Sequence, residues 1–83
     1  MNTELKQTKL ERIKGMTKTE YIEFFQKNLW ENWRIDYTLK WFGEITMDFR
    51  STDWKIRAIG IAKNDIEAME KVAVLLVEKY LFE

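Results

Sequence analysis

Residues 35–50 read IDYTLKWFGEITMDFR, and this stretch decides the fold. Apolar residues occupy every second position on both sides of residues 42–44, and the positions between them are mostly polar. A period of two is typical of strands that bury one face in an antiparallel sheet. The two apolar sets share a face when Trp41 lies opposite Ile45, so the sequence predicts a tight hairpin through residues 42–44.

A third strand is expected after residues 50–53, which are rich in turn-forming side chains. A four-residue loop there places Phe49 opposite Trp54 and keeps the apolar residues of the next pairs on the same face of the sheet. The third strand then covers residues 54–61. The sequence therefore predicts a three-stranded antiparallel meander.

A helix is expected on each side of the meander. Thr17 and Glu20 have the spacing of a capping box, and the helix they begin is expected to run to about Trp33. The apolar residues at helical spacing along it are Ile22, Phe25, Leu29 and Trp33. Asn64 is the expected cap of the last helix, residues 65–81. The order indicates an α+β domain with both helices on one face of the sheet.

Composition limits the function. The chain has 83 residues, a formal net charge of zero, and neither histidine nor cysteine. These absences remove the usual ligands of zinc and haem and the commonest acid–base group, so we expect no enzyme, no metal and no cofactor. No apolar run is long enough to cross a membrane, and a cytoplasmic protein is expected. Residues 1–16 are interpreted as a basic arm, mobile or weakly helical, and residues 17–83 as the domain.

Residues 55–68 read KIRAIGIAKNDIEA and resemble the double-stranded RNA-binding domain family. The family has small residues at the positions of Ala58, Gly60 and Ala62, and an alanine at Ala68; the similarity covers roughly residues 17–81. It implies the same fold and contacts with duplex RNA. The residues placed at the family's RNA-contact regions are Glu23, Gln26, Lys63 and Asn64.

Two of the family's RNA-contact regions are altered in this chain. The loop between the first two strands is short and ends in Glu44, and Asp65 stands where the family carries a lysine. A carboxylate repels phosphate, so the sequence favours a protein-interaction module, such as an adaptor, an inhibitor or a small subunit. Binding of double-stranded RNA is the alternative, and a small DNA-associated regulator is the third hypothesis.

Aromatic residues outside the expected core are the candidate protein contacts. Trp30 and Phe24 lie off the apolar face of the first helix, and Phe42 lies at the hairpin tip. Exposed aromatic side chains are enriched at binding hot spots, so a protein partner or a second copy of the chain is expected to cover them. The other three tryptophans, Trp33, Trp41 and Trp54, are expected in the core.

Overall fold

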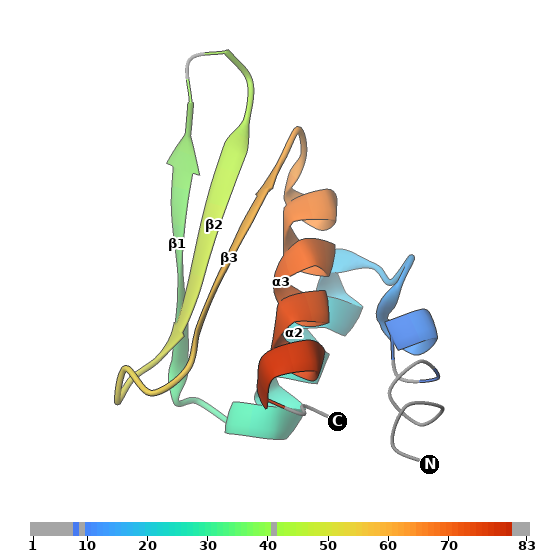
Figure 1. Ribbon diagram of the computed structural model, residues 1–83, viewed down its shortest axis with the longest axis vertical. Coiled ribbons are helices and arrows are strands. Elements are labelled where there is room, and N and C mark those ends of the chain that lie inside the picture. The colour runs from blue at the N-terminus through green and yellow to red at the C-terminus, as the bar shows by residue number, and fades with distance from the viewer. Residues whose placement is uncertain (1–7, 9, 41, 81–83) are drawn as a thin grey trace.

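The described part of the chain forms a three-stranded sheet with helices before and after it. The computed structural model describes residues 8, 10–40 and 42–80. The elements, labelled as in Figure 1, are α2 (Lys18–Leu29), β1 (Trp33–Leu39), β2 (Ile45–Ser51), β3 (Arg57–Ala62) and α3 (Asp65–Tyr80). The strand order is β1-β2-β3, and both neighbouring pairs are antiparallel. The predicted α+β class and the meander are confirmed.

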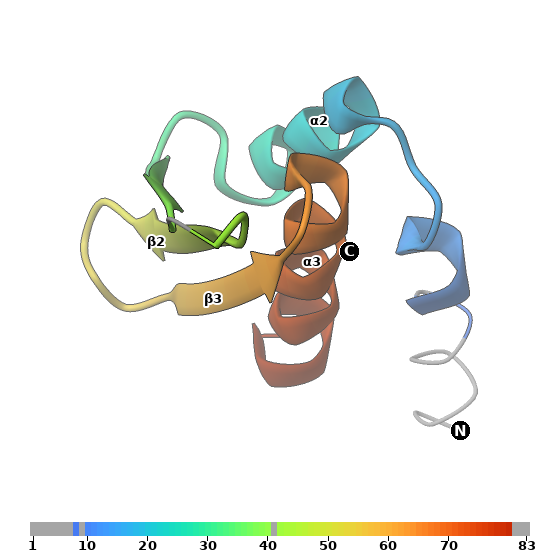
Figure 2. The same cartoon turned by 90° about the horizontal axis from the view of Figure 1, so that it is seen from above.

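The helices form a second layer on one side of the sheet. α3 packs against β3 and β2, and α2 packs against α3. Figure 2 shows both helices on the same side of the strands. Phe25 of α2 also reaches the sheet, since its ring centroid lies 4.8 Å from that of Phe49. The core therefore lies between the sheet and the two helices.

Small residues on the inner face of β3 let α3 approach closely. Ala58, Gly60 and Ala62 are buried, while the residues between them point to the open face of the sheet. A Cβ atom added at Gly60 would lie 2.4 Å from the carbonyl oxygen of Ala68 in α3. The alternation of small and larger residues in β3 thus sets the distance between the layers.

Both predicted hairpin registers are wrong, although each strand residue lies on the predicted face of the sheet. Leu39, not Trp41, lies opposite Ile45. The loop is longer because the amide of Lys40 donates to the Glu44 carbonyl at 2.7 Å, and Gly43 closes the turn with a φ of 89°. A two-residue shift keeps every side chain on its face. Trp41 lies outside the described residues.

The second hairpin is shifted by four residues from its predicted register. Phe49 lies opposite Ala58 rather than Trp54, and β3 begins at Arg57. Ser51 fixes the turn: its hydroxyl donates to Asp53 at 2.6 Å and accepts from the Ile56 amide at 3.0 Å. The residues between Ser51 and Ile56 therefore form the loop, and Trp54 lies in this loop rather than in a strand.

The first helix is shorter than predicted, and its buried face is rotated. It ends at Leu29, four residues before Trp33, which is the first residue of β1. The buried residues of α2 are Tyr21, Phe24 and Phe25. Trp33, predicted on the same helical face as Phe25, packs against Phe25 from the strand instead, with ring centroids 5.3 Å apart. The capping box of α2 is present as predicted.

The described part of the N-terminal segment packs on the domain. Residues 10–13 are helical, in keeping with the weakly helical interpretation of this segment. Ile13 is only 5% exposed and belongs to the core. Its carbonyl accepts a 2.7 Å hydrogen bond from the buried Tyr21 hydroxyl. At least one residue of the expected arm is therefore part of the folded unit.

Candidate functional site

Trp30 occupies a turn position that favours glycine. Its backbone angles are φ 57° and ψ −120°, and the amide of Asn32 donates to the Leu29 carbonyl at 2.9 Å. These values describe the second residue of a type II′ turn, where glycine is preferred because it has no Cβ. Trp30 as a whole is 74% exposed. Neither the turn nor the core accounts for a tryptophan here.

Trp54 repeats this combination in the loop between β2 and β3. Its φ is 64°, and the residue is 64% exposed. The amide of Trp54 donates to the Ser51 carbonyl at 3.1 Å, which closes the turn. The guanidinium of Arg50 lies 4.1 Å from the ring centroid, a cation–π contact that orients the indole. The prediction that Trp54 is a core residue is wrong, because the Ser51 turn ends β2 before it.

A direct hydrogen bond joins the two loops that carry these residues. The amide of Thr52 donates to the Asn32 carbonyl at 3.0 Å. The indole N–H of Trp33 donates to the Trp30 carbonyl at 2.8 Å, which ties the turn to the core. The α2–β1 connection and the β2–β3 hairpin lie at the same end of the molecule (Figure 1). We call this end of the molecule, whose two loops carry Trp30 and Trp54, the tryptophan end.

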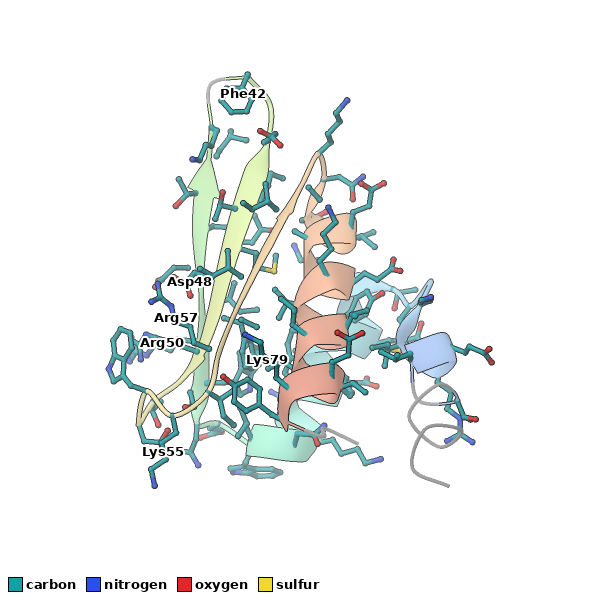
Figure 3. All side chains as sticks on the ribbon, in the orientation of Figure 1. Phe42, Asp48, Arg50, Lys55, Arg57 and Lys79 are labelled. Carbon is teal, nitrogen blue, oxygen red and sulfur yellow. The ribbon has the colours of Figure 1, made fainter. Side chains whose placement is uncertain are left out.

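Positive charge lies next to Trp54 on the open face of the sheet. Arg34, Arg50 and Arg57 occupy one row across the three strands. Asp48 binds Arg57 through two hydrogen bonds of 3.2 Å and 2.8 Å (Figure 3). This hydrogen bonding to Arg57 lowers the pKa of Asp48. Among the described residues neither Arg34 nor Arg50 forms an ion pair, so two arginines of this row lie near the tryptophan end without a paired carboxylate.

The three predicted protein contacts have different surroundings. Trp30 is exposed, as expected from its place outside the buried face of α2. Phe42 is 61% exposed at the hairpin tip, at the opposite end of the sheet from the tryptophan end (Figure 3). Phe24 is only 9% exposed and belongs to the core, so its predicted place outside the buried face is wrong. The buried face of α2 is centred one residue earlier than the predicted apolar face, which contained Ile22 and Phe25.

The residues proposed for RNA contact lie on α2 and at the β3–α3 connection. Glu23, Gln26 and Lys63 are exposed. The side-chain oxygen of Asn64 accepts from the Glu67 amide at 2.9 Å, so it caps α3. Asp65, one residue later, forms a 3.2 Å ion pair with Lys18. The hydrogen bond from Lys18 lowers the pKa of Asp65, so the Asp65 carboxylate remains ionised.

The comparisons with known proteins identify no relative. No family model, no curated protein and no solved structure matches the chain. Within residues 8, 10–40 and 42–80, no cluster of three or more acidic, histidine or cysteine side chains has the arrangement of a metal site. In the same part of the chain, no helix has the length and apolar character needed to cross a membrane.

Proposed function

We propose that this chain is a non-catalytic protein-binding module and that the tryptophan end is its contact surface. The observation that supports this most is the pairing of strain with exposure at Trp30 and Trp54. A non-glycine residue in the left-handed region costs about 1–2 kcal/mol, and an exposed indole recovers little of that by burial. Such strained positions cluster at active sites, ligand clamps and switch regions. A partner that covers both rings would supply the missing stabilisation.

The chemistry of the surface describes the partner. Two large flat rings suit apolar or aromatic side chains, and tryptophan is among the commonest hot-spot residues. Arg50 and the nearby arginine row favour a partner that carries carboxylates around its apolar contact. We therefore propose an apolar protein surface with an acidic rim. The absence of cysteine is in keeping with a reducing compartment, and we place the protein in the cytoplasm.

The test compares three immobilised forms of the chain in extract from its native source. These are the wild type, the double variant Trp30→Gly/Trp54→Gly and, as a matched control, Phe42→Ala at the opposite end. Glycine suits both backbone positions, so the double variant keeps the fold. We expect the wild type and Phe42→Ala to retain the same protein, and the double variant to bind it at least about 30-fold more weakly, as for the loss of a hot spot.

Two results would reject the proposal. Equal retention by all three forms would show that the tryptophan end makes no contact. Loss of all bound material after nuclease treatment would instead support the alternative, nucleic-acid binding. In that case duplex RNA is the ligand to examine next, and Glu23, Gln26 and Lys63 are the residues to replace.

A further inference from the structure

The two edges of the sheet are treated differently by the rest of the molecule. Side chains of α3 occupy the edge of β3. The ammonium of Lys71 donates to the Ile61 carbonyl at 2.7 Å. The Tyr80 hydroxyl lies 3.4 Å from both the amide and the carbonyl of Arg57. Such contacts prevent another strand from pairing with β3.

The edge of β1 carries no such cover among the described residues. The hydrogen bonds from Lys40 to Glu44 and from Thr52 to Asn32 fix which residues face β2. Because hydrogen-bonded pairs alternate in an antiparallel ladder, the even-numbered residues of β1 bond β2. The backbone groups that point away from β2 belong to Trp33, Ile35, Tyr37 and Leu39. None of these groups has a hydrogen-bond partner in the part of the chain that the structure describes.

Like charges face each other within the sheet. Arg34 lies opposite Arg50, and Asp36 lies opposite Asp48. Like charges at directly opposed positions destabilise a sheet. Asp48 is neutralised by Arg57, and Arg50 lies over Trp54, but neither Arg34 nor Asp36 forms an ion pair with a described residue. The charges of β1 are therefore not matched by the chain's own neighbouring strand.

We propose that β1 pairs with β1 of a second copy of the chain, antiparallel and centred on Ile35, to give a continuous six-stranded sheet. In this register Arg34 lies opposite Asp36 of the second copy, and the symmetry repeats this pair. On the other face Trp33 lies opposite Tyr37 of the second copy, whose side chain is half exposed in the single chain. The outward backbone groups of Trp33, Ile35 and Tyr37 then bond those of the second copy.

The charges select this register over its neighbours. Pairing centred on Asp36 places that carboxylate against its own copy. Pairing centred on Tyr37 places Arg34 against Lys40 of the second copy, twice. Of these three registers, only the one centred on Ile35 gives both Arg34 and Asp36 a partner of opposite charge. The inference does not rest on the tryptophan end, since it uses only the free edge of β1.

Charge reversal followed by charge exchange tests the pairing. Sedimentation equilibrium of the full chain is compared for the wild type, Asp36→Arg and the exchange variant Arg34→Asp/Asp36→Arg. Asp36→Arg makes both charge pairs between the two copies repulsive, so we expect the dissociation constant of the dimer to rise about 30-fold. The exchange variant restores both pairs with the wild-type composition, and its dimer should return.

A loss of folding would not explain the expected result, because each replacement improves the charge pairing between β1 and β2 within the chain. The arginine introduced at position 36 would face Asp48, and the aspartate introduced at position 34 would face Arg50, so thermal melting should show no loss of stability. A wild type that stays monomeric at about 0.5 mM overturns the proposal. So does a dimer unaffected by Asp36→Arg, or one that the exchange fails to restore.

Discussion

Replacing Gly60 with alanine tests the packing that holds α3 on the sheet. The added Cβ would lie 2.4 Å from the Ala68 carbonyl oxygen and 3.1 Å from the Val72 Cγ2 atom. An ordinary carbon–oxygen contact is about 3.3 Å or longer, so α3 has to move away by about 1 Å. The oxygen belongs to the helix backbone and has no rotamer through which to escape.

We expect this substitution to lower the free energy of unfolding by about 2–3 kcal/mol. Overpacking a core costs typically about 1–3 kcal/mol, and here the displaced element is the helix that covers β2 and β3. For a domain of this size the melting temperature should fall by roughly 10–20 °C. Urea unfolding followed by circular dichroism measures the change.

Gly43→Ala is the matched control. Its Cβ meets nothing within 4 Å, and only the φ of 89° opposes it, so we expect a loss of about 1 kcal/mol. If the free energy of unfolding of Gly60→Ala lies within about 0.5 kcal/mol of the wild-type value, α3 does not lie directly on β3 and the layer arrangement is refuted.

Three further substitutions test other parts of the fold. Leu76→Ala should cost about 2–5 kcal/mol, because Leu76 is fully buried; a change below about 0.5 kcal/mol in urea unfolding would place that face of α3 in solvent. Tyr21→Phe removes the hydrogen bond to the Ile13 carbonyl, so we expect a loss of about 1 kcal/mol and faster amide exchange at residues 10–13, and unchanged exchange would contradict the docking of this segment. At pH values above about 5, Asp48→Asn should cause a small decrease in the melting temperature. The difference from the wild type should vanish as the pH falls below about 4. The sign follows from the lowered folded pKa of Asp48: its contribution is present above the unfolded pKa and is lost as pH falls through the folded value. A difference that grows on acidification would contradict the Asp48–Arg57 pair.

The alternation of apolar residues was enough to predict the meander and the face of each strand. It did not predict the registers, because shifts by two or four residues preserve the face of every side chain. The registers depend on turn hydrogen bonds, such as those of Ser51 with Asp53 and Ile56. These bonds depend on the position of one hydroxyl, and a period of two carries no information about it.

The candidate site was only partly visible in the sequence. Trp30 was identified from its helical angle, but the type II′ turn that ends α2 was not, because glycine is the residue that signals such a turn. Trp54 was missed, since it fits the apolar alternation of a strand that begins too early. The turn-forming residues before it, Ser51 and Asp53, were the available signal. Phe24 was misplaced by an error of one residue in the centre of the helical face.

The free energy of unfolding of Trp30→Gly/Trp54→Gly tests the central claim most directly, namely that the two tryptophans are present for contact rather than for folding. Relief of left-handed strain at two positions opposes the greater flexibility of glycine in the unfolded chain. We predict a value within about 1 kcal/mol of the wild type, or above it, measured by urea unfolding under conditions where the chain is monomeric. A loss of about 2 kcal/mol or more would show that the indoles stabilise the domain itself, and would contradict the account.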